Sequence, residues 1–342
     1  MKKLNNLLLL FMILFTLSAC GGNDSNSTST NSNSSNEETE RKTYTFKLGH
    51  EAQGTHVKFA VAEKFKTELE SRSDGRMKVE IYPANQLGNE KDMVQQLETG
   101  TLDFGIISNG TMSSRSESLN GWFMPFLFET LEEAGKARET EAAKEMLTEL
   151  EKQGLVGFDV FFAGYRHMLS KSKEITSISE IEGVKIRIPG SPVFEDFWKL
   201  VGAGPTPMPL PEVYTSIQTG VIEAVDVDLD ALLSQKWYET AKYLTLTNHI
   251  AFAEIILGSK TVFDGLSKED QQIVKEAWKA AADWGVAEGI RLENHRIEEI
   301  KEKGVKVTEL ANTKEFDSIK TEIYNKYSEN PVIKAFIEQN QK

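Results

Sequence analysis

Arg187 stands near the end of a segment that has the pattern of a half-buried strand. Residues 184–188 alternate between apolar and basic side chains, which predicts a strand with Arg187 on the face opposite the apolar one. Pro189-Gly190 ends this strand, and Ser191-Pro192 reads as a cap and first residue of a helix over residues 193–201. An arginine at the carboxyl end of a strand, beside a helix start, lies where open α/β sheets bind ligands. The alternative is a solvated surface arginine.

A pair of acids follows in the strand expected over residues 221–227. Asp226 and Asp228 alternate onto one face of its end. They could accept hydrogen bonds from ligand hydroxyls, or they could pair with Arg166 or Lys236.

Two runs of alternating strands and helices must position these residues. The first run covers residues 44–48, 55–71, 77–82, 89–99 and 102–107, and the second covers 184–188, 193–201, 212–219 and 221–227. This order predicts an α/β protein with two lobes, each a parallel sheet flanked by helices. Residues 97–103 and 217–223 have similar sequences around a shared Thr-Gly, which supports related lobes. In the first lobe, Glu51, Ser108 and Asn109 lie at strand ends that face the same cleft.

The remaining segments are expected to join and back the lobes. Two long apolar strands, residues 155–162 and 250–257, should leave the first lobe and return to it, which makes a hinge. Residues 267–303 read as one helix that backs both lobes, with possible bends at Gly285 and Gly289. The aromatic stretch 121–128 reads as core packing. The first lobe is therefore predicted over 43–163 plus 250–342, including one or two helices after residue 312, and the second over 164–249.

The N-terminus has the pattern of an export signal. Lys2-Lys3 precedes an apolar run over residues 7–17, and Leu-Ser-Ala-Cys ends at Cys20. The run is shorter than the roughly 20 residues that span a bilayer. Its last four residues resemble the bacterial lipobox, so residues 1–19 are expected to be a signal peptide and Cys20 to carry a lipid anchor on the extracytoplasmic face. The alternative is an ordinary secretory signal.

Composition narrows the function classes further. The chain has 342 residues, a formal net charge of −13 and one cysteine. Cys20 cannot form an internal disulfide, and no thiol is left for catalysis or metal binding elsewhere. An acidic chain argues against a nucleic-acid partner, because phosphate binding needs a basic face. Residues 20–42, rich in Ser, Asn and Thr, cannot bury a core and read as a disordered tether.

Several segments together resemble the solute-binding subunit of tripartite ATP-independent periplasmic (TRAP) transporters, the dicarboxylate-binding family. They occur in the family's order and are Tyr82-Pro83-Ala84-Asn85-Gln86-Leu87-Gly88, Gly183-Val184-Lys185-Ile186-Arg187-Ile188-Pro189, Gly204-Pro205-Thr206-Pro207-Met208, Glu212-Val213-Tyr214, Gln218-Thr219-Gly220 and Thr247-Asn248-His249. The resemblance implies a two-lobed periplasmic-binding-protein-like fold that closes on a small organic acid. It also implies delivery of that acid to separate membrane subunits, in a transport cycle driven by an ion gradient.

The resemblance assigns roles to individual residues. Arg187 corresponds to the family's principal ligand-carboxylate arginine, and Arg166 stands where many members have a second one. The family segment runs from Gly204 through Tyr214, and Leu210 within it is also expected to contact the ligand. Val227 occupies the position at which members often carry a ligand-binding asparagine, so that contact lacks its side chain here.

The expected ligand is a sugar acid such as a uronate, with a C4 dicarboxylate next. A second ligand carboxylate would meet Asp226, Asp228 and Glu51, which is a poor electrostatic match. No cofactor or metal is expected, because His50 and His56 are isolated in the sequence. The chain is expected to be a monomer.

Two other function classes remain as alternatives. A secreted carbohydrate-active enzyme could use paired carboxylates such as Asp226 and Asp228, although no nucleophile elbow, phosphate loop or His-Glu-Xaa-Xaa-His occurs. The acidic run from Asp226 is not a calcium loop, since Ala231 and Trp237 replace the required glycine and glutamate. A structural lipoprotein would share the N-terminal signal but would not need two arginines in a cleft.

Overall fold

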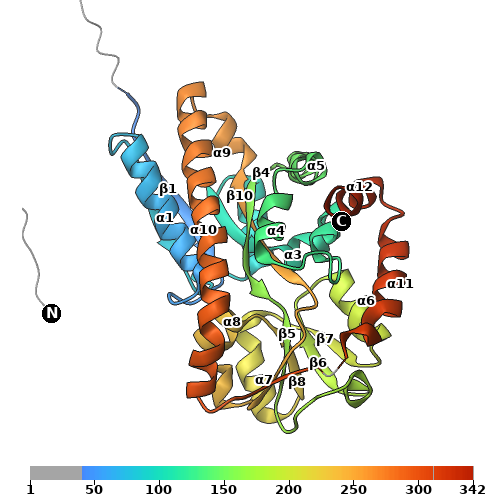
Figure 1. Cartoon of the computed structure of the whole chain (residues 1–342). Helices are drawn as coiled ribbons and strands as arrows, with labels where there is room; N and C mark the ends of the chain where they lie inside the picture. Colours follow the sequence, from blue (N-terminus) through green and yellow to red (C-terminus); the bar gives the residue numbers. More distant parts are fainter. Residues whose placement is uncertain (1–40, 311, 342) are drawn as a thin grey trace, which may run out of the picture. The chain divides into compact units, whose positions relative to one another are not determined.

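The strands form two separate sheets, and each sheet combines strands from distant parts of the chain. The computed structural model describes residues 41–310 and 312–341 (Figure 1). The first sheet has the order β2-β1-β3-β10-β4, with β1 Tyr44–His50, β2 Met77–Tyr82, β3 Phe104–Ser108, β4 Leu155–Tyr165 and β10 Ala251–Ser259. The second has the order β11-β9-β5-β8-β6-β7, with β5 His167–Ser170, β6 Lys185–Ile188, β7 Gly204–Pro207, β8 Ala224–Val227, β9 Tyr243–Leu246 and β11 Lys306–Glu309. The predicted two-lobed α/β fold is confirmed.

Both sheets are mixed, so the prediction of parallel sheets is only partly right. In the first lobe β1 is parallel to β2 and β3, as predicted, but β10 is antiparallel to β3 and β4. In the second lobe β6 is parallel to β7 and β8, whereas β5 is antiparallel to β8 and β9. The antiparallel pairs all involve strands next to the crossings between the lobes. Strand β4 leaves the first sheet and β10 enters it again from the second lobe, so the two run in opposite directions.

Helices cover the sheets and occupy most of the remaining chain. They are α1 Val57–Arg72, α2 Glu90–Thr99, α3 Asn109–Ser113, α4 Leu131–Ala137, α5 Glu141–Glu149, α6 Pro192–Leu200, α7 Val213–Thr219, α8 Leu229–Ser234, α9 Lys260–Asp264, α10 Lys268–Glu302, α11 Asp317–Tyr327 and α12 Pro331–Asn340. Short 3₁₀ turns lie between them: η1 Glu117–Phe123, η2 Leu150–Gln153, η3 Ile178–Ile181, η4 Leu210–Glu212, η5 Trp237–Glu239 and η6 Thr313–Phe316.

The helices that lead into the site begin and end at residues suited to those positions. Asn89 caps α2 through a reciprocal capping box with Asp92. Gly100 and Gly220 end α2 and α7 in the left-handed conformation, at φ 75° and 79°, which glycine adopts without steric cost. The similarity between the two helix-to-strand turns is therefore structural as well as sequential. Ser191 precedes Pro192 at the start of α6, as expected, but its side chain makes no capping hydrogen bond.

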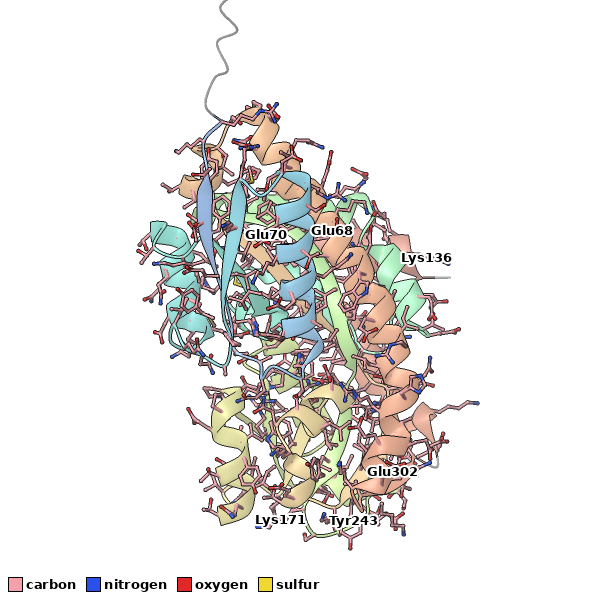
Figure 2. All side chains as sticks on the ribbon, turned by 90° about the vertical axis from the view of Figure 1, so that its left-hand side faces the viewer. Glu68, Glu70, Lys136, Lys171, Tyr243 and Glu302 are labelled. Carbon is pink, nitrogen blue, oxygen red and sulfur yellow. The ribbon has the colours of Figure 1, made fainter. Side chains whose placement is uncertain are left out.

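Helix α10 runs alongside both lobes, as predicted (Figure 1). It packs against α1 and β4 of the first lobe and α8 of the second. In Figure 2, Glu302 at the end of α10 lies at the level of Lys171 and Tyr243 in the second lobe, far from Glu68 on α1. Gly289 serves close packing in this helix, because a Cβ there would lie 2.4 Å from the Phe162 carbonyl oxygen.

The C-terminal segment departs from the predicted lobe boundary. Strand β11 pairs in parallel with β9 of the second sheet, and α11 packs on α6. Only α12, which contacts α5 and η1, lies with the first lobe as expected for residues 312–341. Local sequence does not show which of two sheets offers a free edge to a short strand, and the end of α10 delivers β11 to the second one.

The chain passes directly between the lobes at the two places expected. Strand β4 of the first sheet leads into β5 of the second through Arg166, and β9 leads back to β10 through residues 247–250. The aromatic stretch packs as core: Trp122, Phe123 and Phe128 are buried. These crossings place Arg166 and His249 between the two sheets.

The predicted signal peptide, the predicted lipid-anchor residue Cys20 and most of the predicted tether fall in residues 1–40, outside the described residues. Among the residues that the structure describes, no helix combines the length and the apolar character needed to cross a membrane.

Candidate functional site

A cavity of about 500 Å³ lies between the two lobes and is lined by strand ends and helix starts from both. The first lobe contributes the ends of β1 and β3 and the starts of α1 and α2. The second contributes the end of β6, the loop before α7 and the end of β8. Six of the eight predicted ligand-binding residues line it: Glu51, Ser108, Arg166, Arg187, Leu210 and Asp228.

Arg187 is a buried cation without a carboxylate partner. Its Nε and Nη2 both donate to the carbonyl oxygen of Met208, at 3.0 and 2.8 Å. Among the described residues no Asp or Glu oxygen lies within 4.0 Å of its guanidinium. Arg187 as a whole is only 5% exposed. Burial, followed by the like charge of Arg166, lowers the pKa of Arg187 to about 10, so the side chain remains protonated at neutral pH. A buried, unpaired guanidinium favours an anion.

Arg166 lines the same cavity but has its counter-ions in place. Nε donates to Asp226 Oδ1 at 2.5 Å and Nη1 donates to Asp228 Oδ2 at 2.7 Å. Nη2 donates to the carbonyl oxygen of Asp226, and the Phe252 ring centroid lies 4.3 Å from Cζ. The guanidinium is therefore held rigidly by the protein itself.

Asp226 lies behind the cavity, in a hydrogen-bonded network rather than in the lining. Trp198 Nε1 donates to its Oδ2 at 2.6 Å, and His249 Nε2 lies 2.9 Å from the same oxygen. Burial alone would raise the pKa of Asp226, but Arg166 and His249 lower it to about 2. Of the two roles left open in the sequence, pairing with Arg166 is the one that the geometry shows.

Asp228 has a double structural role beside the cavity. One oxygen pairs with Arg166, and the other accepts the backbone N–H of Ala231 at 2.7 Å, which caps α8. Asp226 and Asp228 therefore both serve as counter-ions of Arg166.

The candidates in the first lobe divide in the same way. Ser108 caps α3, where its Oγ accepts the N–H of Gly110, and it reaches the cavity wall. Asn109 is fully buried outside the lining, and its Nδ2 donates to the Leu119 carbonyl oxygen at 3.0 Å. Asn109 therefore ties α3 to η1, which the strand-end position alone did not reveal.

Three buried charged residues in the lining were missed by sequence reasoning: Lys58, Glu90 and Glu254. Lys58 Nζ lies 2.9 Å from Glu254 Oε2, 3.4 Å from Glu90 Oε1 and 3.5 Å from Glu51 Oε1. Glu254 is the one charged residue in the apolar strand β10, and that is the signal that could have identified it. Glu90 and Lys58 have the pattern of ordinary first-turn residues of their helices, so no comparable sequence signal marks them.

The carboxylates around Lys58 outnumber it. Burial, followed by the charge of Glu90, raises the pKa of Glu51 to about 7. Burial raises the pKa of Glu254 to about 8 against the opposing effect of Lys58. Burial alone would lower the pKa of Lys58, but Glu254, Glu90 and Glu51 raise it. The first-lobe wall is thus acceptor-rich, while the second presents the unpaired cation.

A direct contact joins the lobes beside the cavity. Asp230 on α8 accepts the backbone N–H of Val57 at 2.7 Å and pairs with Arg296 of α10 at 2.5 Å. His56, which lines the cavity, lies 3.6 Å from Asp230 and caps α1 through Nδ1. The described residues contain no group of three His, Cys, Asp or Glu side chains arranged to hold a metal ion.

Comparison with known proteins identifies the family. The model for bacterial extracellular solute-binding proteins of family 7 matches residues 48–330. The 2,3-diketo-L-gulonate-binding periplasmic protein YiaO of Escherichia coli is 29% identical over 263 residues, which cover 77% of this chain and 80% of YiaO.

Two solved structures show the same fold. A TRAP periplasmic solute-binding protein from Bradyrhizobium, in complex with D-galacturonate, has a TM-score of 0.83 at 27% identity and covers 86% of this chain and 99% of its own. Another from Bordetella, with density interpreted as pantoate, has a TM-score of 0.83 at 26% identity and covers 87% and 100%. The protein therefore belongs to family 7 of the bacterial extracellular solute-binding proteins, the solute-binding proteins of TRAP transporters.

Proposed function

We propose that this solute-binding protein captures a hydroxylated monocarboxylic acid, with a sugar acid such as a uronate as the preferred ligand. The observation that carries the proposal is the state of Arg187. Its guanidinium is buried in the cavity wall, and its hydrogen bonds go to a neutral carbonyl oxygen. A ligand carboxylate at this point would supply the missing negative charge through charge-assisted hydrogen bonds.

The opposite wall supports a ligand with hydroxyl groups. Glu51 and Glu254 offer carboxyl oxygens there, and hydroxyl groups can donate to them. The cavity volume of about 500 Å³ lies within the roughly 300–1,000 Å³ typical of small-molecule sites. The galacturonate-bound structure from Bradyrhizobium and the relative named for 2,3-diketo-L-gulonate are consistent with such a ligand.

A thermal-shift screen of the purified protein tests this function. The panel comprises D-galacturonate, D-glucuronate, D-gluconate, succinate and pyruvate, each followed by chemical analysis for turnover. A ligand that binds only the folded state raises the melting temperature, so we expect the largest shift from a sugar acid, without product. A larger shift with succinate would contradict the ligand class, and conversion of a uronate would favour the enzyme alternative.

Family membership places the protein outside the cytoplasm, and we infer that it is held there by lipid. Cys20 within Leu-Ser-Ala-Cys is the proposed attachment point, and the Ser- and Asn-rich segment after it would leave the folded part close to the membrane. The protein would then release its ligand to the membrane subunits of a TRAP transporter as a monomer. Cys20→Ser should move the protein from the membrane fraction to the soluble fraction without changing ligand affinity. Retention of this variant in the membrane would contradict the anchor.

A further inference from the structure

Four charged residues form a compact group on the first-lobe wall of the cavity, which we name the Lys58 cluster: Glu51, Lys58, Glu90 and Glu254. They come from the end of β1, the start of α1, the start of α2 and the middle of β10. Within the described residues, Lys58 is the single cation within 4.0 Å of any of the three carboxylates. The cluster therefore carries more negative than positive groups inside the ligand cavity.

The three carboxylates differ in what they have left to offer a ligand. Glu90 is committed to the protein, because it accepts the N–H of Ser108 at 2.7 Å and the hydroxyl of Thr111 at 2.5 Å. Glu51 and Glu254 have Lys58 as their close charged partner, and both line the cavity. Two carboxylates thus share one ammonium while they face the ligand.

We propose that the Lys58 cluster sets the charge selectivity of the site, so that the protein accepts sugar acids with one carboxylate and rejects those with two. This inference rests on the proposed function. A ligand whose carboxylate is bound by Arg187 presents the rest of its carbon chain to the cluster on the other lobe. A hydroxyl there can donate a hydrogen bond to Glu51 or Glu254. A second carboxylate has no proton to donate and places a like charge against them.

The remaining charged groups around the cavity do not remove this bias. Arg166 is neutralised by Asp226 and Asp228, and Arg187 is used by the first carboxylate of the ligand. Lys91 lines the cavity too, but it is exposed, and water screens its charge. A dicarboxylate would therefore have one strong cationic contact and one repulsive end.

Isothermal titration calorimetry with matched acids tests the inference. The probes are D-galacturonate with galactarate and D-glucuronate with D-glucarate, in which the second acid of each pair carries a carboxylate at the far end. We expect the wild-type protein to bind the better uronate at least about tenfold more tightly than its dicarboxylate counterpart. Equal or tighter binding of the dicarboxylate would overturn the inference.

Two isosteric variants assign the discrimination to the cluster. The calorimetry is run at pH 9, above the pKa values of about 7 for Glu51 and about 8 for Glu254. There Glu254→Gln and Glu51→Gln each remove one negative charge, and each should reduce the uronate preference at least about threefold. Glu302→Gln is the control, because Glu302 is exposed at the end of α10 and is absent from the cavity lining; its preference should match that of the wild-type protein. Two variants are used so that a folding defect in one leaves the other informative.

The outcomes separate this inference from the proposed function. If neither uronates nor their dicarboxylate counterparts bind, the proposed function fails and the charge selectivity fails with it. If both classes bind with similar affinity, or if neither glutamine variant changes the preference, the ligand class stands and the selectivity is wrong.

Discussion

The two arginines of the cavity have opposite surroundings, although both were predicted from the sequence to bind the ligand carboxylate. Arg166 donates to two carboxylates and one carbonyl oxygen, whereas within the described part of the chain Arg187 donates only to the carbonyl oxygen of Met208. Both are buried, at 2% and 5% exposure. A guanidinium that already has its counter-ions stabilises the site's geometry, and one that lacks them is free to bind an anion. The number of carboxylates near each arginine therefore distinguishes a structural arginine from a candidate ligand-binding one better than its place at a strand end does.

The paired arginine also affects the unpaired one. After burial, the like charge of Arg166 is the largest cause that lowers the pKa of Arg187. Arg166 is held in place by Asp226, which is fixed in turn by Trp198 and His249. The network behind the cavity thus holds the Arg166 guanidinium near Arg187, while Asp226 and Asp228 offset its charge.

The largest predicted effect is on folding stability, and it concerns Arg166. Arg166→Gln would leave Asp226 and Asp228 buried without their cation, and breaking a buried ion pair in this way costs about 3–5 kcal/mol. Arg187→Gln makes the same chemical change but leaves no carboxylate behind, so it should cost less than about 1 kcal/mol. Urea denaturation of the ligand-free variants measures both. Equal losses would show that the two arginines are not distinguished by their partners.

The next effect is on affinity, and it concerns Arg187. Arg187→Lys should weaken binding of a sugar acid by about tenfold to a hundredfold, or roughly 1.5–3 kcal/mol, because an ammonium cannot reproduce the two parallel bonds of a guanidinium. Lys185→Arg is the matched control, since Lys185 is an exposed residue of the same strand. Calorimetry should find wild-type affinity for the control. Unchanged affinity for Arg187→Lys would remove Arg187 from the site.

The sequence predicted the helices and strands whose ends are marked by a capping residue, a glycine or a proline. Strand β2 was predicted with its observed bounds, and α2 was predicted between Asn89 and Gly100, because a cap, a glycine or a proline marks each boundary. Short strands without such marks were not foreseen. Strand β11, whose four residues pair with β9, owes its place to the end of α10 and to the free edge of a sheet assembled from residues far away in the chain.

The site was predictable to the extent that strand ends reveal it. Residues at strand ends were predicted to face the cleft, and Arg187, Glu51 and Ser108 do line the cavity. Asn109 also lies at a strand end, but its side chain donates to the Leu119 carbonyl oxygen instead. Lys58 was not foreseen, because helical periodicity indicates a covered face without showing that three carboxylates share it. Whether an arginine is paired depends on contacts across more than 50 residues, such as Arg166 with Asp226, and no local pattern contains that information.

A smaller effect should appear in the pH dependence of stability, where the Lys58 cluster contrasts with the balanced Arg166 network. Glu254 has a folded-state pKa of about 8, raised by burial from 4.5, in the presence of Lys58, Glu90 and Glu51. A raised pKa means that the folded state binds the proton more tightly, so this contribution to stability is complete below about pH 4.5 and is lost as the pH rises through about 8.

Glu254→Gln provides the measurement for this pH effect. The ligand-free wild-type protein should lose melting temperature between pH 5 and pH 8, and the loss should be smaller in the variant. Asp226 offers the opposite sign, since its pKa is lowered to about 2 and its contribution is lost only as the pH falls below about 4. A wild-type melting temperature that rises across pH 5–8, with the same slope in Glu254→Gln, would contradict the unbalanced charge of the Lys58 cluster.

The smallest predicted effect concerns the contact between the lobes. Asp230→Asn keeps an oxygen that can accept the Val57 N–H, but it removes the charge that pairs with Arg296. We expect a loss of about 1 kcal/mol in the closed form, and therefore a fewfold weaker affinity for the same ligand. Because Asp230 is absent from the cavity lining, the variant should weaken uronates and dicarboxylates by the same factor, unlike Glu254→Gln. A change in the ratio of the two affinities would show that Asp230 acts on the ligand itself rather than on the contact between the lobes. Structural residues and ligand-selecting residues would then not be separate groups.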